Sequence, residues 1–237
     1  MVKIGIIGGS GIKDHVLLKN SNVIEDDTKW GNPSHVEIGE LNGIEVAGII
    51  RHGKKHNIPP HKINHKANIQ ILKNLGVEKI IGVTSVGSLK KEYKLPILMV
   101  PHDYITLGNI LTLFDDKVEH ITPEISENLR LNIIDSAKKL NMKIIENGIY
   151  IQTQGPRLET KAEINMFKNY GDVMGMNMAI EATLSKELNI DYANISSIDN
   201  YANGIVDEKL TFEDILESAR KNWSNVEKLL MKLVEVI

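Results

Sequence analysis

The stretch IIGVTSVGSL at residues 80–89 decides the fold that we expect for this chain of 237 residues. Its first half is continuously apolar and rich in β-branched residues, which is typical of a strand buried on both faces. Its second half places the hydroxyls of Thr84 and Ser85 where we expect that strand to end. In open α/β sheets, ligands bind at the carboxyl ends of the strands. The stretch therefore predicts a buried central strand and one wall of a ligand site.

Two other stretches share this design, with a short apolar strand that breaks into glycine, hydroxyl or cationic residues: IGIIGGSG at residues 4–11 and VAGIIRHG at residues 46–53. We expect Ser10 and the N–H groups of its turn to hold a phosphate, and the planar fork of Arg51 to grip two phosphate oxygens. Alone, each feature fits a structural turn or a surface ion pair about as well. Together, the three strand ends predict a site for one small anion. The residues that would enclose it are Ser10, Arg51, His52, Thr84 and Ser85.

The order of the predicted elements favours one compact α/β domain over residues 1–237. Strands and helices alternate without an internal repeat, a linker or a low-complexity segment. Candidate ligand contacts again follow two later strands: Met176 and Asn177 come after a short strand at 172–175, and a polar run from Asp199 to Gly204 comes after a buried strand at 190–198. Side chains in such places are positioned to contact a ligand, although a polar turn is an equally simple interpretation.

Composition and charge exclude several classes of protein. The net charge of −3 gives no basic field for nucleic acid, and the absence of cysteine excludes disulfides and thiolate metal sites. Three histidines cluster in residues 52–61, but no acidic residue accompanies them at a ligand spacing, so we expect no metal. We recognise no signal peptide and no long apolar span. The expectation is a soluble, cytoplasmic protein with no nucleic-acid or membrane partner.

An ordered set of motifs runs along nearly the whole chain: GIIGGSG at 5–11, RHG at 51–53, H-x-I-x-P-H-x-I-N at 56–64, TSVGSL at 84–89, GPR at 155–157, and Gly175-Met176 followed by Glu181. In this order they resemble the methylthioadenosine phosphorylase branch of the purine nucleoside phosphorylases. The resemblance implies a mixed β-sheet flanked by helices, assembled as a homotrimer or homohexamer. It also implies phosphorolysis, in which a nucleoside and inorganic phosphate give a free purine and a pentose 1-phosphate. Phosphate is then a co-substrate, and no cofactor is needed.

The resemblance also assigns roles position by position. Asn177 stands where the family usually has Ser or Thr against phosphate, and Met176 matches a methionine under the ribose. His120 matches a histidine of the 5′ pocket, and Leu158 stands where animal members carry a phenylalanine against the base. The phosphate contacts carried over in this way are Ser10, Arg51, His52 and Ser85, with Thr84 beside them.

The segment expected to read the base departs from the pattern of enzymes that cleave 6-aminopurines. Those members typically carry Asp-x-Asp after the last strand, whereas an ungapped alignment places Asn200-Tyr201-Ala202 there. Adenine presents a donor at N6 beside an acceptor at N7, and a 6-oxopurine presents acceptors at both positions. A carboxylate accepts from N6 but repels O6, whereas an amide donates to O6 and accepts from a protonated N7. A shift of the alignment by one residue would instead bring Asp199 to the base.

The pattern Asn-x-Ala-x-Gly resembles the methylthioinosine phosphorylases. We therefore expect phosphorolysis of S-methyl-5′-thioinosine to hypoxanthine and 5-methylthioribose 1-phosphate in purine and methylthioadenosine salvage, with Asn200 and His52 as the catalytic residues and Tyr201 and Ala202 beside the base. The alternatives are a methylthioadenosine phosphorylase, an inosine/guanosine phosphorylase and, from another class, a purine- or phosphate-binding protein without catalysis. A dinucleotide-dependent dehydrogenase is disfavoured, because Asp14 stands where G-x-G-x-x-G needs its last glycine.

Overall fold

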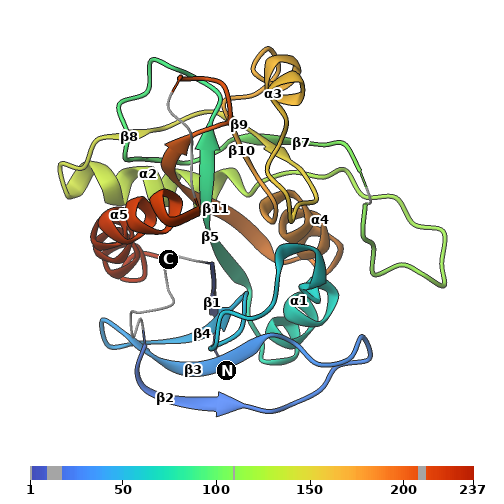
Figure 1. The fold of residues 1–237 in the computed structure, drawn as a ribbon. Helices are drawn as coiled ribbons and strands as arrows, with labels where there is room; N and C mark the ends of the chain where they lie inside the picture. The colour runs from blue at the N-terminus through green and yellow to red at the C-terminus, as the bar shows by residue number, and fades with distance from the viewer. Residues whose placement is uncertain (1, 10–17, 109, 208–211) are drawn as a thin grey trace.

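The computed structural model describes residues 2–9, 18–108, 110–207 and 212–237, and within residues 212–216 it describes the backbone only. These residues form a mixed sheet of eleven strands flanked by helices (Figure 1), which confirms the predicted fold class. The strands are β1 (Ile4–Gly8), β2 (Lys19–Ile24), β3 (His35–Leu41), β4 (Ile44–Ile50), β5 (Lys79–Ser88), β6 (Ile97–Met99), β7 (Asp103–Thr106), β8 (Ile144–Ile145), β9 (Ile149–Gln152), β10 (Val173–Gly175) and β11 (Asp191–Tyr201). The helices are α1 (His65–Asn74), α2 (Glu127–Lys139), α3 (Lys161–Phe167), α4 (Met178–Glu187) and α5 (Phe212–Leu233), with a 3-10 turn at Pro60–Lys62.

Strand β5 is the centre of the sheet, as predicted. It pairs in parallel with β1 on one side and with β11 on the other, and its last residues pair antiparallel with β10. The order β2-β3-β4-β1-β5-β10-β9-β7 continues on both sides, and β11 extends the sheet separately through β6 to β8. The strand ends that the sequence predicts to line the ligand site therefore belong to β5 or to strands close to it in the sheet.

The predicted ends of two strands were wrong. Strand β5 runs on to Ser88 rather than stopping at Thr84, and β11 runs on to Tyr201 rather than stopping at Ile198. The reason is that the two polar segments pair with each other, with Asn200 opposite Gly87 and Tyr201 opposite Ser88. Their backbone groups are thus satisfied in a ladder and not in turns.

This shared ladder contains one irregularity. The register of β11 against β5 shifts between Ile198 and Asn200, so Asp199 is an extra residue that pairs with none on β5. A bulge of this kind bends the strand and redirects the side chains beside it, and such bulges are frequent next to active sites. It falls within the segment that the sequence marked as the reader of the base.

Helix starts follow the capping patterns of the sequence. Asn64 caps α1 by accepting from the backbone N–H of Ala67, and Ser126 caps α2 by accepting from Leu129. Thr160 followed by Glu163 three residues later is a capping-box pattern, and the structure confirms it, because the two side chains bond each other's backbone N–H groups. Thr211, which the sequence offers as the cap of α5, lies outside the described residues. The sequence of α5 also predicts an apolar stripe, and this stripe is buried at Trp223, Val226, Leu230 and Leu233.

Helices cover both faces of the sheet. Helix α4 bonds to Tyr192 through Glu181, and helix α5 bonds to Ser197 through Asn222. Because Tyr192 and Ser197 are an odd number of residues apart on β11, they point to opposite faces, so α4 and α5 lie on opposite sides (Figure 1). Helix α1 packs beside α4, and α2 packs beside α5.

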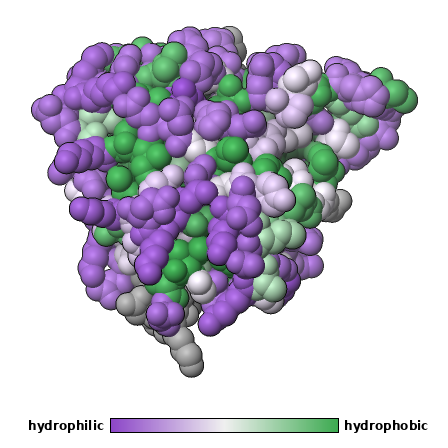
Figure 2. Space-filling view, turned by 90° about the horizontal axis from the view of Figure 1, so that it is seen from above, coloured by the Kyte–Doolittle hydropathy of each residue, from purple (hydrophilic) through white to green (hydrophobic). Residues whose placement is uncertain are grey.

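The outer surface is mainly polar. Seen from above in Figure 2, hydrophilic residues cover most of the face, and hydrophobic residues form patches between them. No helix among the described residues has the length and apolar character that crossing a bilayer requires.

Replacing Ile81 with alanine should destabilise the protein strongly, because this side chain is 0% exposed in the strand that joins β1 to β11. We expect the free energy of unfolding to fall by about 2–5 kcal/mol in urea denaturation. Ile44→Ala is the matched control, since Ile44 is 39% exposed at the start of β4, and should cost less than about 1 kcal/mol. Equal losses for the two variants would contradict the central place of β5.

Candidate active site

Arg51 is a fully buried arginine at the end of β4. Its Nε and one Nη2 hydrogen donate to the carboxylate of Glu181 in α4, at 2.6 and 3.1 Å. Its Nη1 donates to the carbonyl of Val83 and its Nη2 to the carbonyl of Ile7, both at 3.2 Å. Burial opposes the positive charge, but Glu181 outweighs that effect and the pKa of Arg51 is raised. Four of its five N–H groups are therefore engaged, and one hydrogen on Nη1 is left for a ligand.

Gly9 marks the point where the three predicted strand ends converge. A Cβ atom on Gly9 would lie 2.8 Å from Arg51 Nη1, 3.8 Å from the carbonyl of Val83 and 3.9 Å from His52 Nε2. Only glycine leaves this space open, because a Cβ contact below 3.0 Å forces a neighbour to move. The ends of β1, β4 and β5 thus meet as the sequence predicted. Ser10, which we expected beside Gly9, lies outside the described residues.

His52 presents an unprotonated nitrogen to this point. Its Nδ1 donates to the carbonyl of Ile58 at 2.8 Å, so Nε2 is the acceptor in the neutral ring. Burial, followed by the charge of Arg51, lowers the pKa of His52 to about 4. The ring is therefore neutral at physiological pH and can accept a hydrogen bond from an acidic O–H, such as that of hydrogen phosphate.

Thr84 and Ser85 point to opposite faces of β5. Ser85 Oγ donates to Asp199 Oδ2 at 2.6 Å on the face covered by α5. Thr84 Oγ1 donates to Asn194 Oδ1 at 3.0 Å on the face covered by α4. Successive side chains of a strand alternate between faces, so Thr84 and Ser85 would approach an anion from different sides, and the contact of Thr84 with phosphate stays a prediction. Thr84 still borders a small cavity of about 20 Å³ with Gly9, Ser85 and Asp199.

The bulge in β11 brings Asp199 and Asn200 to the same face. Asp199 bonds to Ser85, whereas Asn200 Nδ2 would lie 3.3 Å from a Cβ atom on Gly87. Ser85 and Gly87 are two residues apart on β5 and so share a face. Asp199 therefore stands at the end of the site near Gly9, and Asn200 stands farther along the strand beside Ala202.

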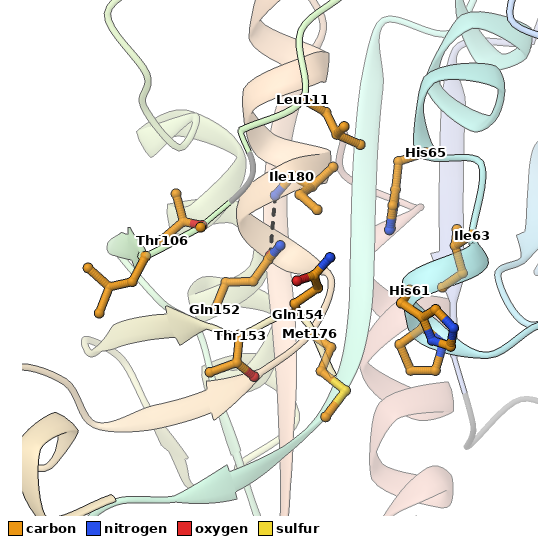
Figure 3. A pocket seen from close by; sticks show the side chains of 13 residues that line it. His61, Ile63, His65, Thr106, Leu111, Gln152, Thr153, Gln154, Met176 and Ile180 are labelled. Atoms are coloured by element: carbon orange, nitrogen blue, oxygen red, sulfur yellow. Dashed lines mark hydrogen bonds between the residues drawn. The ribbon is translucent and has the colours of Figure 1, made fainter. Parts of the chain in front are cut away.

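Met176 lines a larger cavity of about 160 Å³, shown in Figure 3. His61 and His65 approach it from the segment around α1, and Gln154 approaches it from the segment after β9. The neighbouring Gln152 accepts from the N–H groups of Ala179 and Ile180, which occupies donors at the start of α4. Beside them, Asn177 is buried and its Oδ1 accepts from none of the described residues.

Other predicted site residues lie at the edge of the site or outside it. Leu158 is 46% exposed, and His120 is exposed and lines neither cavity. The hydroxyl of Tyr201 donates to the carbonyl of Tyr93 at 2.5 Å, which gives this side chain a structural role. Within this one chain, the structure does not bring His120 to the other predicted residues.

Comparison with known proteins now decides the family. A sequence model described as the phosphorylase superfamily matches residues 3–235. The chain belongs to this superfamily. A probable 6-oxopurine nucleoside phosphorylase from Archaeoglobus fulgidus is 42% identical, over 99% of this chain and 96% of the relative. A probable S-methyl-5′-thioinosine phosphorylase from Methanocaldococcus jannaschii is 43% identical, over 98% of this chain and 90% of the relative.

The fold agrees with this membership. The methylthioadenosine phosphorylase of Schistosoma mansoni, solved in complex with adenine, superposes with a TM-score of 0.93 and 27% identity, over 100% of this chain and 91% of that one. The phosphorylase is thus an enzyme of the purine nucleoside and methylthioadenosine phosphorylase family, a pentosyltransferase. The resemblance drawn from the motifs is confirmed.

Sequence reasoning missed two buried carboxylates of the phosphorylase that hold neighbouring side chains in place by hydrogen bonds. Glu181 was quoted as part of a motif but not as the partner of Arg51. Glu159 is buried next to Leu158, accepts from Thr153 Oγ1 at 2.5 Å, and accepts from Asn203 Nδ2 at its backbone carbonyl. An acidic residue inside a GPRLET segment was the available signal for Glu159, whereas nothing local in the sequence pairs residue 51 with residue 181.

Arg51→Met should destabilise the phosphorylase by about 3–5 kcal/mol, because it leaves the buried Glu181 carboxylate without a counter-charge. Urea denaturation at pH 7 measures the loss. Arg157→Met is the matched control, since Arg157 pairs with Glu163 at the surface and its removal should leave the unfolding midpoint nearly unchanged. A small effect at Arg51 would show that its ion pair does not hold the strand ends.

The stability of the phosphorylase should fall as the pH drops below 6.5, in part because of His65. Burial, with the nearby charge of Arg51, lowers the pKa of His65 to about 3, whereas an unfolded histidine titrates near 6.5. Between about pH 6 and 4, unfolding is therefore accompanied by uptake of a proton at this residue. As the pH decreases, the free energy of unfolding falls by up to about 1.4 kcal/mol per pH unit. His65→Phe should lose this part of the slope in urea titrations, and an unchanged slope would contradict the burial of a neutral ring.

Proposed function

We propose that the phosphorylase cleaves 6-oxopurine nucleosides, with S-methyl-5′-thioinosine as its substrate and hypoxanthine and 5-methylthioribose 1-phosphate as products. The observation that carries the proposal is that Asn200 and Ala202 lie beside Gly87. These two residues present a neutral amide and a methyl group at the positions where a pair of carboxylates would select a 6-amino group. The methylthio substituent is supported by the name of the relative from Methanocaldococcus jannaschii.

The buried Glu159 supports the same choice of base. A 6-oxopurine carries a hydrogen on N1, whereas N1 of adenine is an acceptor. Glu159 borders the base-reading segment, because Asn203 of that segment donates to its backbone carbonyl, and its carboxylate accepts from Thr153 Oγ1. Carboxylate oxygens are hydrogen-bond acceptors, so this side chain favours the base that offers N1–H. Mismatched buried polar groups cost orders of magnitude in kcat/KM, which is enough to decide between the two bases.

The phosphate would lie near Gly9, between Arg51 and Ser85. One Nη1 hydrogen of Arg51 is left for it, and His52 Nε2 is placed to accept the hydrogen of HPO₄²⁻. In the reaction, a phosphate oxygen forms the new bond to C1′ as the C1′–N9 bond breaks, and the electron pair of that bond leaves with the purine. The departing purine anion takes up a proton from solvent at N7, and the Asn200 carbonyl oxygen accepts a hydrogen bond from that N7–H. Positioning and electrostatics supply the rate enhancement.

A second candidate is phosphorolysis of methylthioadenosine. The similarity to the Schistosoma mansoni enzyme, solved with adenine, favours it. Against it, the one carboxylate in the base-reading run, Asp199, is engaged by Ser85 and Ser197 at the other end of the site.

The test is release of free base from methylthioinosine, methylthioadenosine and inosine, each with and without phosphate. We expect release only with phosphate and fastest from methylthioinosine. Asn200→Ala should lower kcat/KM by about 10²-fold or more, the scale for losing one transition-state hydrogen bond. Asn165→Ala, an exposed asparagine on α3, is the control and should match the wild type.

Two outcomes would contradict the proposal. Faster cleavage of methylthioadenosine would favour the second candidate, and a loss below threefold in Asn200→Ala would remove Asn200 from the reaction. The double variant Asn200→Asp with Ala202→Asp restores the carboxylate pair and should shift the preference toward the 6-aminopurine substrate.

A further inference from the structure

Asp199 carries a buried carboxylate that the reaction as proposed does not use. It is 4% exposed, and both of its oxygens accept from serine hydroxyls. Ser85 Oγ donates to Oδ2 at 2.6 Å, and Ser197 Oγ donates to Oδ1 at 2.5 Å. The two serines face each other across the β5–β11 ladder. One of these two hydroxyls, that of Ser85, is also the one predicted to contact phosphate.

A chain of hydrogen bonds from α5 fixes the direction of the bond at Oδ1. Asn225 Nδ2 donates to Asn222 Oδ1 at 3.1 Å, which orients that amide. Asn222 Nδ2 then donates to Ser197 Oγ at 2.8 Å, so the hydrogen of Ser197 is directed to Asp199 Oδ1. Oδ1 is therefore held as an acceptor, and a proton on this carboxyl group belongs on Oδ2, next to Ser85.

Whether Oδ2 of Asp199 carries a proton decides whether Ser85 can donate a hydrogen bond to an anion. A serine hydroxyl has one hydrogen to donate. When Asp199 is ionised, that hydrogen is used on Oδ2, and Ser85 turns only lone pairs toward the cavity beside Gly9. When Oδ2 carries a proton, Asp199 becomes the donor to Ser85 Oγ, and the hydrogen of Ser85 becomes available for a phosphate oxygen.

We propose that Asp199 is a positioning residue that couples phosphate binding to the uptake of one proton: the protonated carboxyl group turns Ser85 into a phosphate donor, and the ionised group withdraws it. The inference rests on the proposed function, because it requires phosphate at Ser85. The proton comes from solvent and goes to Asp199 Oδ2, no covalent bond of phosphate changes, and the bound complex holds one more proton than its separate parts.

The surroundings of Asp199 suit this coupling. Burial raises the pKa of Asp199 to about 6, although Ser197, Ser85 and Asn222 act against the rise. On the side of α5, Ala219 and Trp223 border the same small cavity, and no charged side chain of the described residues is among the causes of this shift. Beyond Gly9 lie the neutral His52 and Arg51, whose charge is offset by Glu181. An arriving phosphate dianion adds negative charge and raises the pKa of Asp199 further.

The experiment is calorimetric titration of inorganic phosphate into the enzyme at pH 7.5, in two buffers with different enthalpies of ionisation, for the wild type and Asp199→Asn. The amide of the variant supplies a permanent N–H to Ser85 and cannot take up a proton. We expect the wild type to bind up to about one more proton per subunit than the variant, since ionisation of phosphate itself contributes equally to both. Asp135→Asn, an exposed aspartate on α2, is the matched control and should keep the wild-type value.

Steady-state kinetics gives an independent measure that a purely structural role would not move. Above about pH 6, the phosphate KM of the wild type should rise by up to about tenfold per pH unit more than that of Asp199→Asn, with the nucleoside KM unaffected. Ser197→Ala removes a donor to the carboxylate and so raises its pKa, which should move the onset of this rise to higher pH. The Ser197 variant tests the proposal even if Asp199→Asn does not fold.

Equal proton uptake in the wild type and Asp199→Asn, with phosphate bound by both, would overturn the coupling and leave the proposed function intact. An unshifted pH profile in Ser197→Ala would overturn it as well. The absence of any phosphate binding to the wild type would overturn the anion site itself, and the coupling with it.

Discussion

The buried ion pair between Arg51 and Glu181 is the interaction on which the site depends. Removing two charges from water costs several kcal/mol per ion, and only good geometry and further hydrogen bonds offset that cost. Here Arg51 also donates to the carbonyls of Ile7 and Val83, and Glu181 also accepts from Tyr192. The pair thereby ties β1, β4, β5 and β11 to helix α4. The proposed anion site lies where these strands are held together, and one hydrogen of Arg51 is left for a ligand there.

The bulge at Asp199 is the second constraint, and it positions residues at both ends of the proposed substrate site. Without the extra residue, Asp199 and Asn200 would point to opposite faces of the sheet. With it, both lie on the same side of the sheet, Asp199 at Ser85 and Asn200 at Gly87, which are two residues apart along β5. One strand thus presents an amide where the base would lie and a carboxyl group where phosphate would lie. Under the proposed function, this arrangement keeps the carboxylate of Asp199 away from the base although it is next to Asn200 in the sequence.

The two opposite faces of β5 carry different kinds of polar network. On the side of α4, Thr84, Asn194 and Tyr192 extend the ion pair into a fixed, buried array. On the side of α5, the chain from Asn222 through Ser197 to Asp199 ends at Ser85, which borders a cavity. Asp199 belongs to the network on the α5 side, so the proposed coupling of phosphate binding to protonation acts from that side.

The sequence by itself determined the class of fold, the central strand, the convergence of three strand ends and the family. Those features are local: apolar runs define buried strands, capping residues start helices, and ordered motifs such as RHG and TSVGSL follow one another along the chain. Only the tertiary structure decided the partner of Arg51, the face of Thr84, and the separate places of Asp199 and Asn200. Each of these depends on residues about 110 or more positions apart, and on a single register shift between two strands. A period of two predicts which side chains share a face only as long as the ladder is regular, and one extra residue in β11 reverses that prediction for every side chain that follows it.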